Sequence, residues 1–212
     1  CRDDANRLAG EGKLLIDTAM SMLESVATVL GVACVALAAR RSMWTFPTAI
    51  GSVVLIGFVV FEARLYSDAL LQGFFVAANC YGWLNWLRSK EKSGEVLVER
   101  MSAASRLRWA IGWMIATIAW GAAMHLFTNA AYPWWDAAIA IASVAAQLLM
   151  ARRLIENWLI WIAVDVASVP LYLAKGLYLF AGLYVIYLAL ACWGLFDWHR
   201  ACGRDPAEPL TA

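Results

Sequence analysis

The chain has 212 residues and a mean hydropathy of +0.64, with 63% hydrophobic and only 16% charged residues. Soluble domains are roughly half apolar and about a quarter charged, so this composition excludes most of them and indicates an integral membrane protein. The formal net charge of +1 lacks the basic excess of a nucleic-acid-binding protein, so we expect no nucleic-acid partner. The abundance of apolar residues also excludes a disordered chain.

The sequence carries no motif typical of an enzyme or a metal site. Its five cysteines form no C-x-x-C pair and no zinc spacing, and its two histidines, His125 and His199, are expected on opposite sides of the membrane. G-x-S-x-G, phosphate-loop and H-E-x-x-H motifs are missing. We therefore expect no catalytic residue, no bound metal and no cofactor. An enzyme that uses membrane carboxylates alone is the least favoured alternative.

Seven apolar stretches are long enough to cross a bilayer as helices, which takes about 20 residues each. They cover residues 14–39, 44–63, 66–87, 109–128, 134–150, 158–174 and 177–197. Asp17 and Glu24 lie in the first stretch, so its embedded part is expected to begin near Leu23. The predicted all-α organisation is a polar segment 1–13, a three-helix bundle 14–87, a loop 88–108, a connector helix 109–128, a second bundle 134–198 and a tail 199–212.

The distribution of basic residues predicts the orientation in the membrane. With the N-terminus outside, the inner segments carry twelve Lys and Arg residues and the outer segments carry five. Basic residues favour the cytoplasmic side, so we expect an external N-terminus and a cytoplasmic C-terminus. The loop 88–108 is then cytoplasmic, and its mixture of basic and acidic residues is typical of a solvated linker.

The chain repeats itself at an offset of 112 residues, without a gap between residues 34 and 88. The matching pairs include Arg40–Arg152, Arg41–Arg153, Tyr66–Tyr178, Cys80–Cys192, Gly82–Gly194, Trp86–Trp198 and Arg88–Arg200. Four crossings separate the two copies, so both enter the membrane in the same direction. Such parallel repeats are related by an axis along the membrane normal, which predicts a 3+1+3, SWEET-like transporter with its site on that axis. A duplication that only stabilises a bundle is the alternative.

Polar and aromatic residues form a stripe along one face of two predicted spans. One stripe consists of Trp158, Trp161, Asp165, Ser168 and Tyr172, with Asn157 just before it, and the other contains Asp68, Gln72, Phe75, Asn79 and Trp86. Polar groups in hydrocarbon are costly, so these faces predict a pocket for a small polar, aromatic ligand. The predicted substrate-binding residues are Gln72, Phe75, Asn79, Asn157, Trp158, Trp161, Asp165, Ser168 and Tyr172.

The repeat counterparts of the 158–172 stripe are all apolar. A ligand that is itself asymmetric, bound on a pseudo-symmetry axis, would require such a difference between the two repeats. The tryptophans near span ends are interpreted as an interfacial belt, and they are Trp44, Trp83, Trp86, Trp109, Trp134, Trp135 and Trp198. Gln147 suits a ligand contact and a bond to a neighbouring helix equally well.

The two striped segments resemble the third and sixth helices of the PnuC family. The first reads YSDALLQGFF over residues 66–75, followed by Tyr81-Gly82-Trp83, and the second reads ENWLIWI over 156–162, followed by Asp165 and Tyr172. The resemblance covers about residues 24–200. It implies a multi-pass protein of the bacterial inner membrane with a SWEET-like fold and an external N-terminus. It also implies a homotrimer that carries nicotinamide riboside, an NAD precursor, by facilitated diffusion. Relatives of similar sequence carry riboflavin or thiamine, and these substrates are the alternative.

The implied substrate fits the residues chemically. Nicotinamide riboside is a pyridinium cation, which Trp158 and Trp161 would stack against and Asp165 would neutralise or hydrogen-bond. The related mononucleotide would need a cation in the site, and the one candidate, Lys175, is expected at the outer end. The riboside is therefore favoured. A membrane scaffold or receptor, whose polar faces only hold helices together, is the alternative from another class.

Overall fold

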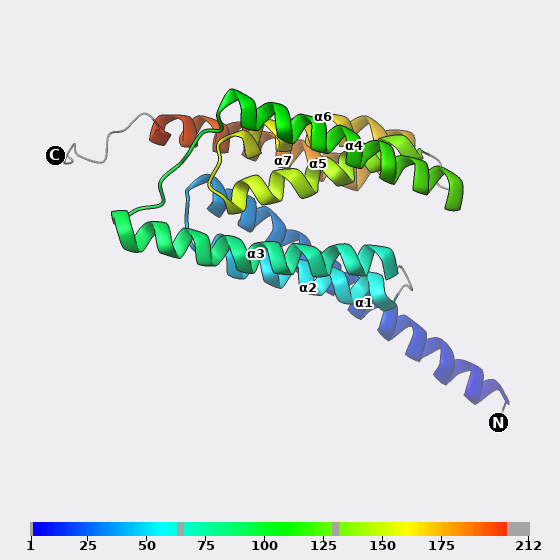
Figure 1. The fold of residues 1–212 in the computed structure, drawn as a ribbon. Coiled ribbons are helices and arrows are strands. Elements are labelled where there is room, and N and C mark those ends of the chain that lie inside the picture. Colours follow the sequence, from blue (N-terminus) through cyan, green and yellow to red (C-terminus); the bar gives the residue numbers. More distant parts are fainter. Residues whose placement is uncertain (1, 63–65, 129–131, 203–212) are drawn as a thin grey trace.

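The structure is a computed structural model that describes residues 2–62, 66–128 and 132–202, without the side chains of residues 2–19 and 66–68. Seven helices make up these ranges (Figure 1). They are α1 (Arg2–Ala39), α2 (Thr45–Glu62), α3 (Tyr66–Ser93), α4 (Ala103–Phe127), α5 (Pro133–Ala151), α6 (Glu156–Ala174) and α7 (Tyr178–Cys202). Residues 2–13, expected as a separate polar segment, are the first turns of α1.

Six of these helices are long and apolar enough to cross a membrane, and α3 is the exception. The first of the six spans covers Met20–Ala39, close to the start expected at Leu23. Polar side chains such as Gln72 and Asn79 lower the hydropathy of α3. Its 28 residues still give a length of about 42 Å, more than the roughly 30 Å hydrocarbon core. The polar residues of α3 turn towards other helices, as described below, so α3 can cross the membrane within the bundle.

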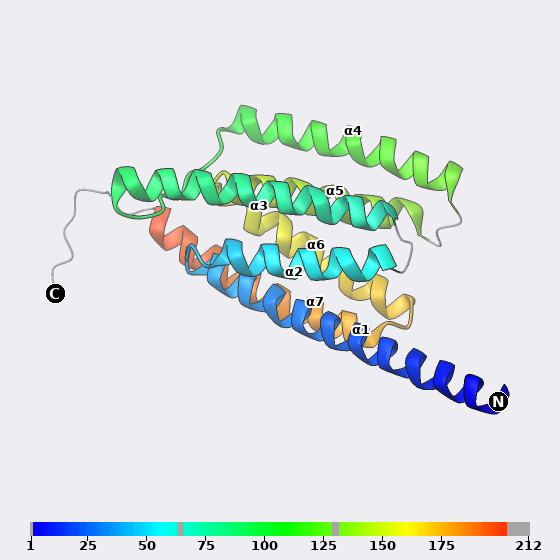
Figure 2. The same ribbon diagram turned by 90° about the horizontal axis from the view of Figure 1, so that it is seen from below.

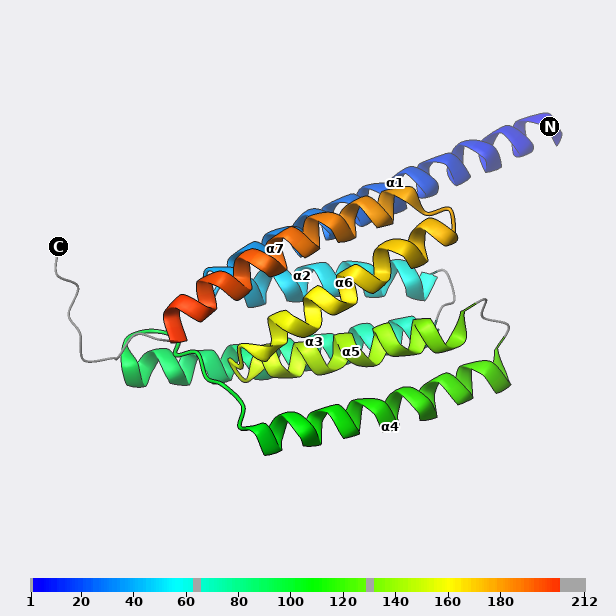
Figure 3. The same ribbon diagram turned by 90° about the horizontal axis from the view of Figure 1, so that it is seen from above.

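Six helices form a closed ring. Contacts run from α1 to α2, α2 to α3, α3 to α5, α5 to α6, α6 to α7, and from α7 back to α1. In the part of the chain that the structure describes, α4 packs mainly against α5, on the outside of this ring, and Arg106 at its start pairs with Glu156 of α6 at 2.8 Å (Figure 2, Figure 3). The interior of the ring is therefore built by the two three-helix segments, and the connector helix takes no part in it.

The linker between α3 and α4 is shorter and more ordered than the sequence suggests. A solvated loop was expected over 88–108, but α3 continues to Ser93 and α4 begins at Ala103. The intervening residues run along the turn between α5 and α6, where Glu99 forms an isolated parallel bridge with Leu154. Backbone hydrogen bonds of 3.0 Å on each side of this bridge hold the linker in place. We call this end of the bundle the linker end.

A buried aromatic cluster fills the ring at the linker end. It consists of Phe46, Trp86, Trp158 and Trp198, each at most 1% exposed. Phe46 packs edge-on against Trp86 with ring centroids 5.0 Å apart, and Trp158 packs edge-on against Trp198 at 5.6 Å. The interpretation of Trp86 and Trp198 as interfacial belt residues is therefore wrong. Their indole N–H groups find buried carbonyl acceptors, which removes the need for an interfacial position.

Residues 112 positions apart make matching contacts around this cluster. Phe46 and Trp158 are such a pair, and both are approached closely by a glycine of the same repeat. A Cβ atom on Gly82 would lie 2.7 Å from Phe46, and one on Gly194 would lie 2.5 Å from Trp158. Glycine is therefore required at both places for the helices to come this close, so the sequence repeat is also a repeat of packing.

The turns at the linker end repeat in the same way. Arg41 and Arg153 follow α1 and α5 with φ values of 55° and 61°, a left-handed conformation that is uncommon outside glycine. Arg41 pairs with Asp197 at 3.8 Å, and Arg153 donates to the Asn85 carbonyl at 3.0 Å. Asn85 and Asp197 are themselves 112 positions apart. Each arginine thus ties its turn to the last part of the opposite repeat.

Candidate functional site

A cavity of about 240 Å³ lies inside the ring of helices. All six ring helices contribute to it, and no residue of α4 lines it. The lining residues are Gly31, Cys34, Val35, Ala38, Ala49, Ser52, Val53, Gln72, Phe75, Asn79, Gln147, Met150, Trp158, Trp161, Asp165, Tyr184, Tyr187 and Ala191. Trp158 also belongs to the aromatic cluster, which therefore closes the cavity towards the linker end.

Many lining residues come in pairs 112 positions apart. These pairs are Val35–Gln147, Ala38–Met150, Ala49–Trp161, Val53–Asp165, Gln72–Tyr184, Phe75–Tyr187 and Asn79–Ala191. The cavity is thus shared between equivalent positions of the two repeats. Ala49 and Val53 of α2 are small and apolar, whereas the equivalent positions of α6 carry the Trp161 indole and the Asp165 carboxylate. The two walls differ chemically although they are equivalent in position.

The structure brings six of the nine predicted site residues to this cavity and leaves three outside it. Gln72, Phe75, Asn79, Trp158, Trp161 and Asp165 line it. Asn157 is fully buried in the first turn of α6, where its side-chain amide donates to the Leu154 carbonyl at 2.7 Å. Ser168 is also fully buried without lining the cavity. Tyr172 lies behind the wall, stacked on Tyr184 with ring centroids 5.1 Å apart.

Two amide side chains connect α3 and α5 across the cavity wall. The Gln147 amide donates to Asn79 Oδ1 at 3.1 Å, and the Asn79 amide donates to the Phe75 carbonyl at 2.8 Å. Both residues are nearly fully buried. Gln147 therefore makes the bond to a neighbouring helix, and it also lines the cavity, so a contact with a ligand stays a prediction. The pair gives the cavity a fixed patch of hydrogen-bonding groups.

Asp165 is the one charged residue among those that line the cavity. It is 3% exposed, and no hydrogen bond or ion pair joins its carboxylate to any residue within the described ranges. Lys175, the one cation that the sequence offered for this site, binds Asp136 at 2.8 Å instead. A carboxylate in an apolar interior needs a partner, so Asp165 marks a place where a cationic or hydrogen-bond-donating ligand would be stabilised.

Sequence reasoning missed several lining residues. Tyr184 and Tyr187 were not proposed, although they are the repeat counterparts of Gln72 and Phe75. Applying the offset of 112 to the predicted stripe would have found both. Ser52 gave no signal, because a single serine on an apolar helix is common. Its hydroxyl donates to the Ala27 carbonyl at 2.8 Å.

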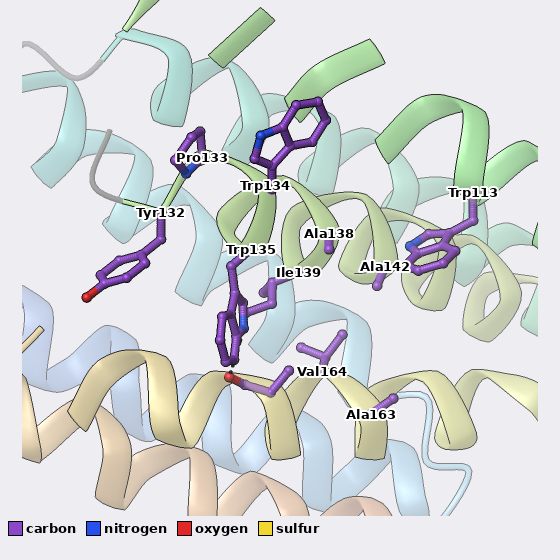
Figure 4. A pocket seen from close by; sticks show the side chains of 11 residues that line it. Trp113, Tyr132, Pro133, Trp134, Trp135, Ala138, Ile139, Ala142, Ala163 and Val164 are labelled. Atoms are coloured by element: carbon purple, nitrogen blue, oxygen red, sulfur yellow. Dashed lines mark hydrogen bonds between the residues drawn. The ribbon is translucent and has the colours of Figure 1, made fainter. Parts of the chain in front are cut away.

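A second hollow of about 730 Å³ lies outside the ring, between α4, α5 and α6 (Figure 4). Its walls are apolar and carry tryptophans from α4 and α5, among them Trp113 and Trp135. The Trp135 indole points towards α6, where it donates to the Ala167 carbonyl at 3.1 Å (Figure 4). None of its lining residues is charged. It therefore lacks the polar groups of the central cavity and is not assigned as a substrate site.

The side chains that the structure describes form no metal site. Within residues 20–62, 69–128 and 132–202, no three His, Cys, Asp or Glu side chains come close enough together to hold a metal ion. The groups available for chemistry at the cavity are indole and phenol rings, amides and one carboxylate. These groups can bind a small ligand by stacking, hydrogen bonding and charge.

Membrane-length helices around a polar and aromatic cavity define a multi-pass membrane protein with an internal cavity. The family model described as nicotinamide mononucleotide transporter matches residues 21–200, so the chain belongs to this family of vitamin transporters, the PnuC family. The family consists of transporters rather than enzymes.

Individual relatives differ in the vitamin they are named for. The chain is 36% identical over 215 residues to the riboflavin/roseoflavin transporter RibM of Streptomyces davaonensis, covering 97% of each chain. It is 28% identical over 225 residues to the nicotinamide riboside transporter PnuC of Escherichia coli, covering 91% of each. Its fold is similar to the crystal structure of the vitamin B3 transporter PnuC, with a TM-score of 0.70 over 92% of this chain and 88% of that chain, at 23% identity.

Proposed function

We propose that the protein carries nicotinamide riboside into the bacterial cell by facilitated diffusion. The observation that supports this most is the unpaired Asp165 carboxylate beside Trp158 and Trp161 in the central cavity. Trp161 and Asp165 are four residues apart on α6 and so share one helix face. An indole face and a carboxylate both attract a cation, and the pyridinium ring offers a positive charge in a flat aromatic shape.

The dimensions and charge of the cavity bear on the choice of substrate. Ligand pockets typically have volumes of about 300–1,000 Å³. The volume of this cavity, about 240 Å³, is slightly smaller than that range. A small vitamin fits this better than riboflavin, whose flavin has three fused rings. No Lys, Arg or His is found among the lining residues that the structure describes. The phosphate of nicotinamide mononucleotide would therefore find no cationic partner, which favours the riboside.

Riboflavin is the second candidate, and the sequence similarity to RibM supports it. Riboflavin is neutral, so it would leave the Asp165 carboxylate without a charged partner. Thiamine, which is also a cation, is the third candidate.

The proposed mechanism is alternating access between two three-helix halves in a 3+1+3, SWEET-like arrangement, with the N-terminus outside. The matching contacts 112 positions apart support a parallel repeat. The aromatic cluster keeps the linker end closed, so release on that side requires the halves to separate there. The twelve-to-five bias of basic residues supports a cytoplasmic linker end. A homotrimer in the bacterial inner membrane, implied by the family resemblance, completes the proposal.

A competition panel on the purified protein tests the substrate. Quenching of tryptophan fluorescence would be titrated with nicotinamide riboside, nicotinamide mononucleotide, thiamine and riboflavin, in wild type and in Asp165→Asn. We expect the riboside to bind tightest and to lose affinity in Asp165→Asn, while the binding of neutral riboflavin is unchanged. Tighter binding of riboflavin than of the riboside by the wild type would favour the RibM-like alternative.

A further inference from the structure

The surface between α4 and α5 at the linker end is hollowed into a groove of about 570 Å³. It lies outside the ring of helices and shares no residue with the central cavity. One end of the groove carries Ser105, Arg108 and Arg152, and the remainder is lined by apolar residues of both helices. The groove is therefore amphipathic along its length.

The two arginines of the groove have no acidic partner among the residues that the structure describes. Nearby arginines have acidic partners, since Arg106 binds Glu156 at 2.8 Å and Arg153 binds Glu99. No ion pair joins Arg108 or Arg152 to an acidic residue in the part of the chain that the structure describes. The Arg152 guanidinium lies 5.7 Å from the centre of the Trp109 ring, which holds it at the mouth of the groove.

The whole groove extends over about 16 Å along α4, from Ser105 to Ala116, and its apolar part from Trp109 to Ala116 extends over about 10 Å. This apolar part fits within one bilayer leaflet, whose hydrocarbon is about 15 Å thick. Small residues make room along it, and a Cβ atom on Gly112 would meet no atom within 4 Å. The shape suits an extended acyl chain.

We propose that this groove binds an anionic phospholipid, with its phosphate between Arg108 and Arg152 and an acyl chain along Gly112. Arginine binds phosphate oxygens well, and basic pockets between membrane helices at the cytoplasmic side are suited to anionic lipid headgroups. The hollow of Figure 4 provides the contrast, because its lining carries no charge that could select a headgroup. The lipid would fill the space between α5 and the connector helix, whose backbone lies close to no other helix in the described ranges.

Lipid binding by the purified full chain tests this proposal, whichever vitamin is carried. Native mass spectrometry would count phosphatidylglycerol and phosphatidylcholine molecules retained by the wild type, by Arg108→Gln/Arg152→Gln and by Gly112→Leu. We expect the double variant to lose phosphatidylglycerol binding by about tenfold or more, because each basic side chain near a headgroup contributes on the order of tenfold or somewhat less. Gly112→Leu keeps both charges but fills the groove, so it should lose lipid as well.

The matched control is Arg88→Gln/Arg100→Gln, which removes two exposed charges at the same end outside the groove. Arg108→Lys/Arg152→Lys keeps both charges and should restore most of the binding if the Gln variant folds poorly. Equal loss in the control pair and the groove pair would overturn the proposal. Unchanged lipid binding in Gly112→Leu, accompanied by a change in the number of subunits, would also overturn it and assign the groove to a second copy of the chain.

Discussion

Trp86 and Trp198 are 112 positions apart, and their indole N–H groups make the same hydrogen bond in opposite halves of the protein. Trp86 on α3 donates to the Met150 carbonyl of α5 at 3.0 Å, and Trp198 on α7 donates to the Ala38 carbonyl of α1 at 3.0 Å. The two acceptors are also 112 positions apart. Each bond joins one three-helix segment to the other. We call these two hydrogen bonds, from Trp86 and from Trp198, the latch, and they lie between the central cavity and the linker end.

Replacing Trp198 with Phe should weaken this latch. The change removes one buried hydrogen bond and part of a fully buried ring, which together cost about 1–3 kcal/mol of folding stability. Thermal unfolding in detergent measures the loss, and Trp86→Phe should show a similar one. The control is Trp44→Phe, because Trp44 is 70% exposed and its replacement should change stability little. Equal effects of Trp198→Phe and Trp44→Phe would contradict the buried position of the latch.

Close packing of the aromatic cluster predicts an unusual sensitivity to a single methyl group. Gly194→Ala should destabilise the protein by about 1–3 kcal/mol, because the new Cβ overlaps the Trp158 ring and forces it to shift. Gly182 lies in the same helix with no atom within 4 Å of a Cβ position, so Gly182→Ala should be neutral or stabilising by up to about 1 kcal/mol. Thermal unfolding of both variants measures the difference. If their unfolding midpoints shifted by the same amount, the close contact between Gly194 and Trp158 would be disproved.

Trp161 is expected to form the stacking surface for the substrate. Trp161→Ala should weaken binding of nicotinamide riboside by about 1–3 kcal/mol, as measured by isothermal titration calorimetry. Trp161→Phe should retain part of the affinity. Trp135→Ala is a suitable control, because Trp135 lines the uncharged outer hollow (Figure 4). A comparable loss of affinity in Trp135→Ala would show that Trp161 has no special contact with the ligand.

The orientation can be tested with single cysteines in a cysteine-free background. Tyr132 precedes α5 at the end opposite the linker, and Lys92 lies in the last turn of α3 at the linker end. A membrane-impermeant maleimide should label Tyr132→Cys in intact cells and Lys92→Cys only after permeabilisation. The reverse pattern would overturn the assignment of the linker end to the cytoplasm.

The helices and the repeat could be predicted because they depend on local patterns. Apolar stretches of membrane length and an offset of 112 residues are visible in the sequence, and spacing by three and four residues placed Trp158, Trp161 and Asp165 on one face. The same spacing also selected Tyr172, which lies behind Tyr184. A helix face is wide, and only the neighbouring helix decides which part of it borders the cavity.

Features that depend on distant contacts could not be predicted. Trp198 near a span end suits an interfacial belt, and only the Ala38 carbonyl, 160 residues away in the chain, explains its burial. The linker was expected to be solvated because its charges give no hint of a partner. Glu99 nevertheless bonds through its backbone to the turn at Arg153, and this contact depends on how α5 and α6 are placed.

Uptake of radiolabelled nicotinamide riboside by proteoliposomes tests the central claim most directly. The vesicles would hold the purified protein and no kinase, with and without an inward proton gradient, and with the membrane potential held at zero because nicotinamide riboside is a cation. The internal concentration should rise to the external concentration and stop there, equally in both conditions, because the described spans contain no chain of paired acidic or histidine groups to relay protons. Uptake no faster than into protein-free vesicles would contradict the substrate, and accumulation above the external concentration would contradict the passive mechanism.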